Sequence, residues 1–437
     1  MSVILAIVAL GVLILVHELG HFLIAKLCGV YVERFSIGFG PQLLTRTKNG
    51  TEYCISAIPL GGYVKLHRMF EEEEAIEGKE GAAFFNKSYP KKIFVIAAGV
   101  LFNVIFAVVL MSAIFMIGYK SYSPLVGSVV SGSAAERAGF VAGDRILSVD
   151  GESVRSFEEF LYKMNDTVSS LSDIEVVRDG KKFTLPIENL KQSYTNQLGE
   201  TVEVADTGVE LYIPPVVGGI APMSAAEKAG LQVGDRIVSI AGTPMNRWQD
   251  ISGAVRTHAE EPLLVVAERD GESLELTITP IANDVSGETI GVLGVIAGGG
   301  DLTLRENPFT AVALGFSRTV EMTGLIYKGM WQLVSGKVSA DNLGGPILIV
   351  KEAANSAKDG IERYFAFTAF ISLNLAVLNI LPVPILDGGY IVMYLFEAIT
   401  RRKVGARVRE TGQRIGFALL GLLMVFAFYN DIVRFIK

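Results

Sequence analysis

Two histidines and a glutamate near the N-terminus have the spacing of a metal site. His17, Glu18 and His21 lie in the string HELGH. On a helix, histidines four residues apart share a face, so both imidazoles can hold one Zn²⁺ with the glutamate beside the metal. The pattern predicts that His17 and His21 are metal ligands and that Glu18 is the catalytic carboxylate of a metalloprotease.

The segment that carries this motif is apolar. Residues 2–27 are long enough to cross a bilayer as one helix, and ionisable groups are costly at that depth. A cleaved signal peptide is the alternative. The segment has no basic N-terminal region, however, and the motif falls where a signal peptide must be apolar. A soluble zinc protease would instead place the motif on an amphipathic helix, so we expect a site within the membrane.

A catalytic zinc site normally has three protein ligands and one open position. The second apolar segment, residues 93–119, offers no further ligand. Residues 374–389 contain two prolines that must break a helix, and Asp387 is the one carboxylate in this apolar stretch. We therefore predict Asp387 as the third ligand.

Composition and charge favour a membrane protein. Half of the residues are apolar and only 19% are charged. The net charge of −7, without a block of basic residues, argues against nucleic-acid binding. Two cysteines, Cys28 and Cys54, are too few for a disulfide framework.

The hydropathy pattern predicts four spanning helices, and basic residues predict their orientation. The spans are residues 2–27, 93–119, 364–386 and 415–429 with its flanks. The link between the last two spans contains basic residues that place it in the cytoplasm: Arg401, Arg402, Lys403, Arg407 and Arg409. Both termini and the segment 120–363 are then extracytoplasmic, and the HELGH motif lies in the cytoplasmic half of its helix.

The extracytoplasmic segment contains an internal repeat. The strings SAAERAG and GDRI at 133–146 recur as SAAEKAG and GDRI at 224–237, a constant offset of 91 residues. The repeat resembles the PDZ core and predicts two PDZ domains of α+β class, at 120–213 and 214–298. Late glycine runs at 208–211 and 294–296 suggest circularly permuted copies. A structural spacer without a ligand is the alternative.

The remaining segments carry weaker signals. The cytoplasmic loop 28–92 contains short β-like runs around Gly38, Gly61 and Gly62, which predict a membrane-associated β-hairpin region. Residues 36–40 or 58–64 could offer an edge strand to an extended substrate, with an ordinary surface hairpin as the alternative. The acidic run 71–74 is predicted to be a solvated flexible linker. His67 and His258 are predicted to be surface residues. Residues 299–360 predict an amphipathic helical segment.

These motifs together resemble the site-2 protease family of intramembrane zinc metalloproteases. The resemblance rests on HExxH in the first span, Gly99-x-x-x-Asn103 in the second, the pattern Asn-x-x-Pro-x-Pro-x-Leu-Asp-Gly at 379–388, and the PDZ repeats. It covers nearly the whole chain, which as a whole is expected to be an α-helical membrane protein with spans three and four in residues 361–437. Tyr390 is a local difference, since the resemblance leads us to expect His there in some members of the family.

The resemblance also implies roles for asparagines and glycines near the site. Asn379 would hydrogen-bond the substrate backbone or the developing oxyanion, with helix packing as the alternative. Asn374 is a weaker candidate for substrate binding and fits a structural role better. Gly99 and Asn103 are equally compatible with helix packing and with a part in the site.

By resemblance, the protein is a zinc protease of the bacterial inner membrane. Its substrates would be single-span proteins already shortened by a site-1 protease: an anti-sigma factor and remnant signal peptides. The PDZ pair would act as a size filter that excludes intact ectodomains. The main rival is a membrane PDZ scaffold with an inert metal motif. A transporter would instead show inverted repeats among its spans, and none is apparent.

Overall fold

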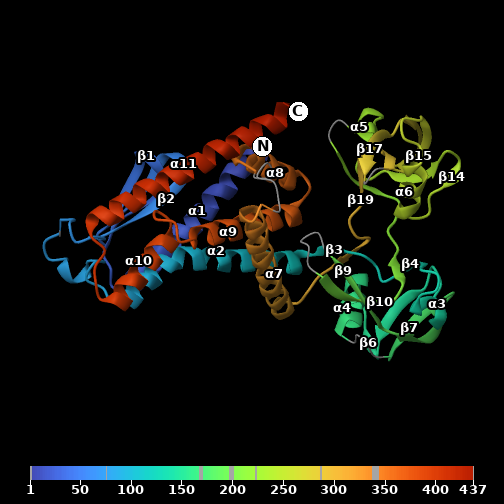
Figure 1. Cartoon of the computed structure of the whole chain (residues 1–437), viewed down its shortest axis with the longest axis horizontal. Helices are drawn as coiled ribbons and strands as arrows, with labels where there is room; N and C mark the ends of the chain where they lie inside the picture. Colours follow the sequence, from blue (N-terminus) through green and yellow to red (C-terminus); the bar gives the residue numbers. More distant parts are fainter. Residues whose placement is uncertain are drawn as a thin grey trace. The chain divides into compact units, whose positions relative to one another are not determined.

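A computed structural model describes residues 2–74, 76–166, 171–195, 201–221, 224–285, 288–336 and 344–436. The chain forms two compact units (Figure 1). One contains Met1–Gly118 and Arg305–Lys437, and the other contains Tyr119–Leu304. We describe them separately as the helical unit and the repeat unit.

Among the described residues, four helices of the helical unit are long and apolar enough to cross a membrane, in agreement with the four spans predicted. They are α1 (Ser2–Leu27), α2 (Tyr89–Ile117), α9 (Ile361–Asn379) and α11 (Ala406–Ile436). Helix α2 packs along α9 and α1. The charged residues of α2, α9 and α11 lie toward the ends of those helices, whereas α1 carries the HELGH motif away from its ends.

The third span ends earlier than we predicted. Helix α9 stops at Asn379, because Pro382 and Pro384 cannot continue a helix, and a separate helix α10 (Asp387–Thr400) begins after the turn. The predicted break at the two prolines is thus confirmed, and the helix of the third span ends at 379 instead of 386. As a consequence, Asp387 opens a new helix.

Two further helices fall in the segment predicted to be amphipathic. Helix α7 (Pro308–Val334) starts at Asn307, whose side chain accepts hydrogen bonds from the first N–H groups of the helix. Helix α7 packs on α2 and α9. Helix α8 (Pro346–Lys358) is capped by Asp431 of α11, a buried carboxylate that accepts three backbone N–H bonds at 2.8, 2.9 and 3.1 Å.

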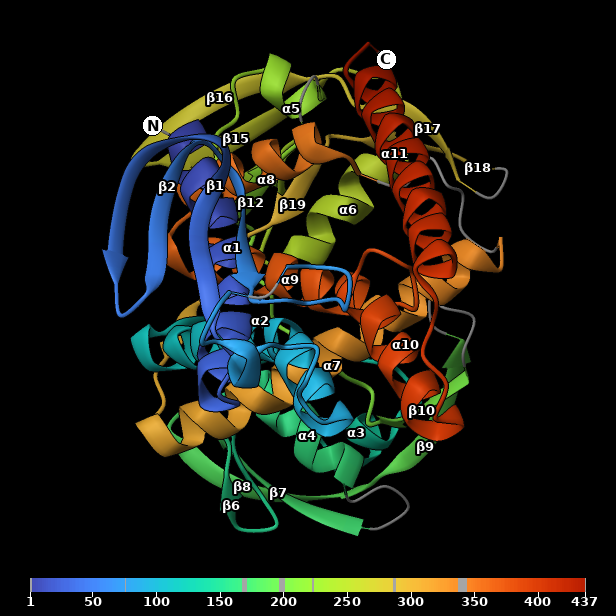
Figure 2. The same cartoon turned by 90° about the vertical axis from the view of Figure 1, so that its left-hand side faces the viewer.

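The first loop forms a folded sheet beside α1. Strands β1 (Val32–Lys48) and β2 (Thr51–Leu66) are antiparallel and run alongside α1 (Figure 2). Both strands bend, so residues 34–37 pair with 52–55 on one side and with 62–65 on the other. Residues 36–37 are thus interior, and our suggestion of an edge strand at 36–40 was wrong. Residues 62–65 form one edge, where no further strand of the described residues pairs with them.

The segment that joins this sheet to α2 is folded, against expectation. His67 is fully buried, and its ring nitrogen Nδ1 lies 2.9 Å from the Glu33 carboxylate, so the prediction of a surface histidine was wrong. Its backbone also bonds to Tyr31 and Phe84, which fold the loop back over it. In the acidic run, Glu71 and Glu72 form ion pairs with basic residues that flank the start of α11. The four residues of the run are exposed, as expected of a solvated segment, and these two ion pairs lie on the surface.

The repeat unit contains the two copies found in the sequence, with the same order of elements in each. The first copy comprises β4 (Val126–Val129), α3 (Ala134–Ala138), β5 (Arg145–Val149), β6 (Glu152–Ser153), α4 (Phe157–Asp166), β7 (Leu171–Arg178), β8 (Lys181–Glu188), β9 (Leu190–Thr195), β10 (Thr201–Asp206) and β11 (Val209–Leu211). The second comprises β12 (Val217–Ile220), α5 (Ala225–Lys228), β13 (Arg236–Ile240), β14 (Thr243–Pro244), α6 (Trp248–Arg256), β15 (Leu263–Arg269), β16 (Glu272–Ile278), β17 (Ile281–Val285), β18 (Glu288–Val292) and β19 (Val295–Ala297).

Both copies close in the same way. Each has a four-stranded sheet, β6-β5-β7-β8 or β14-β13-β15-β16, and in each the last strand pairs with the first. A buried Asp and an Arg bond through two nitrogen–oxygen contacts in each copy, Asp144 with Arg178 and Asp235 with Arg269. Strands β3 (Tyr119–Ser121) and β20 (Leu302–Leu304) pair, which brings the two ends of the unit together.

Candidate metal centre and active site

The structure brings His17, His21 and Asp387 together. The Nε2 atoms of His17 and His21 are 3.2 Å apart, and they lie 3.3 and 3.5 Å from Oδ2 of Asp387. Three donors that share a tetrahedral Zn²⁺ at bond lengths of about 2.0–2.1 Å lie about 3.3–3.4 Å from one another. Oδ2 of Asp387 is buried and has no hydrogen-bond partner among the described residues. The donor set and its spacing therefore fit zinc.

Asp387 reaches the histidines because of the turn before it. The turn after α9 contains Ile385 with a φ of 116°, a strained conformation for a β-branched residue. The next helix then begins at Asp387, and its first turn lies directly on the backbone of the turn. A Cβ at Gly388 would sit 2.1 Å from the carbonyl oxygen of Ile380, so this close approach requires glycine.

Helix α2 contacts both imidazoles. Nδ1 of His21 lies 2.9 Å from the carbonyl oxygen of Val95 and donates to it, which leaves Nε2 free for a metal. A Cβ at Gly99 would lie 2.4 Å from Nε2 of His21 and 2.6 Å from Cε1 of His17. The fully buried amide of Asn103 lies 3.4 Å from Nδ1 of His17. Gly99 and Asn103 thus border the site itself.

Val95 carries no signal in the sequence that could have identified it. Its contribution is a backbone carbonyl, which every residue type possesses. Only the packing of α2 on α1 decides which carbonyl meets the histidine.

Glu18 faces the edge strand of the sheet. A Cβ at Gly62 would be 3.2 Å from Cγ of Glu18 and 2.8 Å from the carbonyl oxygen of Ser36, so β2 passes close to the carboxylate. Gly38 and Gly61 are placed differently. Both have positive φ and pack against other residues of the same sheet, and they shape its bends.

The two predicted asparagines of α9 lie in different surroundings. Asn379 is the last residue of the helix and is half-buried, and its side chain forms no hydrogen bond among the described residues. Asn374 donates to the carbonyl of Phe370 at 2.8 Å and lines a cavity of about 330 Å³ against α7. Only the amide of Asn379 is free to bind another group.

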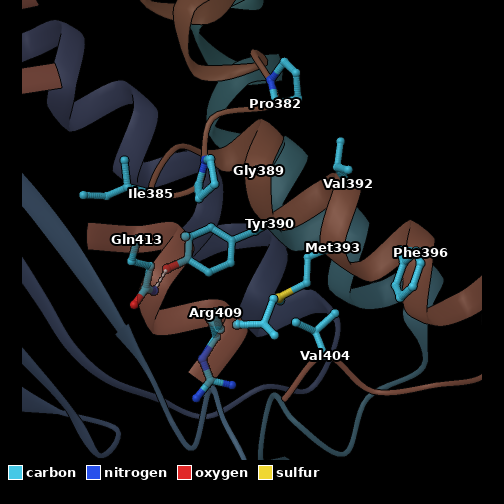
Figure 3. A pocket seen from close by; sticks show the side chains of 13 residues that line it. Pro382, Ile385, Gly389, Tyr390, Val392, Met393, Phe396, Val404, Arg409 and Gln413 are labelled. Atoms are coloured by element: carbon cyan, nitrogen blue, oxygen red, sulfur yellow. Dashed lines mark hydrogen bonds between the residues drawn. The ribbon is translucent and has the colours of Figure 1, made fainter. Parts of the chain in front are cut away.

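A larger apolar cavity lies on the other side of the Asp387 turn. It has a volume of about 410 Å³ and is bounded by the turn, α10 and the start of α11 (Figure 3). Tyr390, which stands where some members of the family are expected to have His, points to α11 and accepts a hydrogen bond of 2.9 Å from Gln413. Arg409 lines the same cavity and pairs with Glu72. The Tyr390 hydroxyl is therefore engaged by α11.

Membrane-spanning helices that hold a His-His-Asp cluster beside a glutamate define a class, the membrane-embedded metal-dependent hydrolases. Comparison with known proteins identifies the family within this class. The model of Peptidase family M50 matches residues 5–423, and the chain belongs to this family, the site-2 proteases. It is accordingly a zinc metalloendopeptidase.

Several curated relatives match along nearly their whole length. The Regulator of sigma-E protease RseP of Salmonella typhimurium is 38% identical, and its namesake in Escherichia coli is 37% identical. A putative zinc metalloprotease of Vibrio cholerae is 34% identical. Each match covers 98% of this chain and 97% of the relative.

Among solved structures, one match covers part of the chain. A PDZ domain of an SdrC-like protein from Listeria monocytogenes is 22% identical, and the match covers 21% of this chain and 88% of that domain. Its TM-score of 0.17 is too low to support an argument about the fold.

Proposed function

We propose that the protein cleaves single-span membrane proteins within or near their spanning segment, after a site-1 protease has trimmed them. The single observation that carries this proposal is the cluster of His17, His21 and Asp387 within 3.5 Å, on helices that can span a membrane and beside Glu18. By similarity to the relatives that regulate sigma-E, the substrate classes are an anti-sigma factor and remnant signal peptides.

In the proposed mechanism His17, His21 and Asp387 would hold the zinc ion. A bound Zn²⁺ supplies a Lewis acid that polarises the scissile carbonyl and activates water. Glu18 takes the proton of the attacking water and returns it to the leaving amine. The free amide of Asn379 donates to the substrate backbone or to the developing oxyanion. We assign Asn374 a structural role, because its amide already bonds to the helix backbone.

A substrate helix must unwind before its backbone can be cleaved. The edge formed by residues 62–65 has one paired side and passes beside Glu18 at Gly62. We propose that the unwound substrate adds to this edge as a further strand, with the sheet lying at the membrane. Gly62 permits the close approach, whereas Gly38 and Gly61 maintain the bends of the sheet.

The proposed topology places the active site toward the cytoplasm of a bacterial inner membrane. Arg401, Arg402 and Lys403 lie in the connection between α10 and α11, and such short basic connections remain cytoplasmic. Both termini and the repeat unit are then periplasmic. We propose that both repeats are PDZ domains and that they exclude intact ectodomains by their bulk.

Two substitutions test the reaction. Glu18→Gln removes the base and retains all three ligands, so we expect normal zinc content and cleavage reduced by at least about 100-fold. Asp387→Ala removes a ligand and should lose both zinc and cleavage. Normal cleavage by Glu18→Gln would refute the assigned base. The rival, an inert PDZ scaffold, predicts that neither change affects function in cells.

Deletion of residues 126–298 tests the size filter. If the repeats exclude ectodomains, the shortened protein should cleave an untrimmed single-span substrate that the full chain leaves intact. Cleavage of a trimmed substrate by both proteins is the control. Unchanged selectivity would refute the filter and leave the protease assignment standing.

A further inference from the structure

The two candidate histidine ligands have different partners at their Nδ1 atoms. His21 donates from Nδ1 to the carbonyl of Val95, so its proton lies away from Nε2. His17 needs an equivalent acceptor, because a neutral imidazole that binds a metal through Nε2 carries its proton on Nδ1. The group beside Nδ1 of His17 is the amide of Asn103.

The orientation of the Asn103 amide decides whether it can accept the Nδ1 proton of His17. As placed, Nδ2 of Asn103 lies 3.4 Å from Nδ1 of His17, and Oδ1 is buried without a hydrogen-bond partner among the described residues. The oxygen and nitrogen of an amide have nearly the same shape, so their assignment follows from the hydrogen-bond network. Exchanging them gives the oxygen a donor, the Nδ1–H of His17, and places the NH₂ group where Oδ1 stood.

Asn103 is held firmly enough to position a ligand. Its side chain is fully buried, and its backbone carbonyl accepts a hydrogen bond of 2.8 Å from the buried hydroxyl of Ser372 on α9. The same helix, α9, leads into the turn that presents Asp387. Asn103 therefore links the helix of the two histidines to the helix that precedes the third ligand.

We propose that Asn103 is a positioning residue: its amide oxygen accepts the Nδ1 proton of His17 and directs Nε2 of that ring toward the metal. The inference rests on the proposed metal site and goes beyond it. Loss of such an outer partner typically weakens metal binding 10- to 100-fold. A residue that only fills space between α1 and α2 would be replaceable by an apolar side chain of similar size.

The test measures zinc affinity of the full-length protein in detergent by competition with a chromophoric chelator. Asn103→Leu retains bulk and removes the acceptor, and we expect zinc binding 10- to 100-fold weaker. Asn103→Asp retains an acceptor and should bind within a few-fold of the parent. Ser112→Ala, which alters another buried polar residue of α2, is the control and should leave affinity unchanged.

A second measurement reports directly which nitrogen of the His17 ring carries the proton. In zinc-free protein with ¹⁵N-labelled histidine, the nitrogen shifts of His17 should show the Nδ1–H tautomer in the parent and in Asn103→Asp, and should lose it in Asn103→Leu. Parental zinc affinity in a folded Asn103→Leu variant would overturn the inference, as would equal losses in the Leu and Asp variants. His17→Ala separates the two proposals: if it retains zinc, the metal site itself is wrong.

Discussion

The close approach of Gly99 to both imidazoles leads to a quantitative prediction for Gly99→Ala. The added Cβ would lie 2.4 Å from Nε2 of His21, whereas non-bonded carbon and nitrogen atoms lie about 3.5 Å apart. One partner must therefore move by about 1 Å. Helix α2 cannot recede without loss, because it holds His21 through the Val95 carbonyl and borders His17 through Asn103. The imidazoles must then shift instead.

A misplacement of about 1 Å in catalytic geometry costs about 100-fold in rate, which corresponds to about 2.7 kcal/mol of transition-state stabilisation. We expect Gly99→Ala to reduce kcat/KM on a trimmed single-span substrate by this factor and to weaken zinc retention. Gly421→Ala on α11 is the matched control, since that helical glycine has open space around it. If Gly99→Ala cleaved within threefold of the parent and retained zinc normally, the steric reasoning would be refuted.

Three further predictions concern stability. Asp235→Asn removes the charge of a buried carboxylate that pairs with the partly exposed Arg269, and it should destabilise the second repeat by about 1–3 kcal/mol, seen as faster hydrogen exchange there. Asp144→Asn should act on the first repeat alone. The hydrogen bonds from Arg269 hold the pKa of Asp235 below its ordinary value of 3.8. The stabilisation from this pair is therefore present at neutral pH and is lost as the pH falls below 3.8. If hydrogen-exchange protection of the second repeat did not fall below pH 3.8, this prediction would be contradicted. Asp431→Ala leaves three N–H groups of α8 without their acceptor and should cost about 1–3 kcal/mol, measured as faster exchange in the first turn of α8.

Much of the architecture was predictable because its signals are local. Spanning helices follow from uninterrupted apolar runs, and the repeat follows from strings that recur at one offset. The HELGH spacing and a carboxylate in an apolar, proline-broken segment are chemically unusual, so they mark candidate ligands without knowledge of packing. The two prolines end α9 as predicted, and the structure adds that Asp387 begins the next helix, α10.

Tertiary structure decided everything that depends on which backbone meets which side chain. The Val95 carbonyl behind His21 and the edge at 62–65 beside Glu18 are backbone features, and their position depends on helix packing and strand register. The burial of His67 depends on a loop that folds back over it. The sequence by itself therefore determined the candidate metal donors and the number of predicted spans, since these depend on residue type and local pattern. Only the fold decided how the donors are oriented, because orientation depends on contacts between residues far apart in the chain.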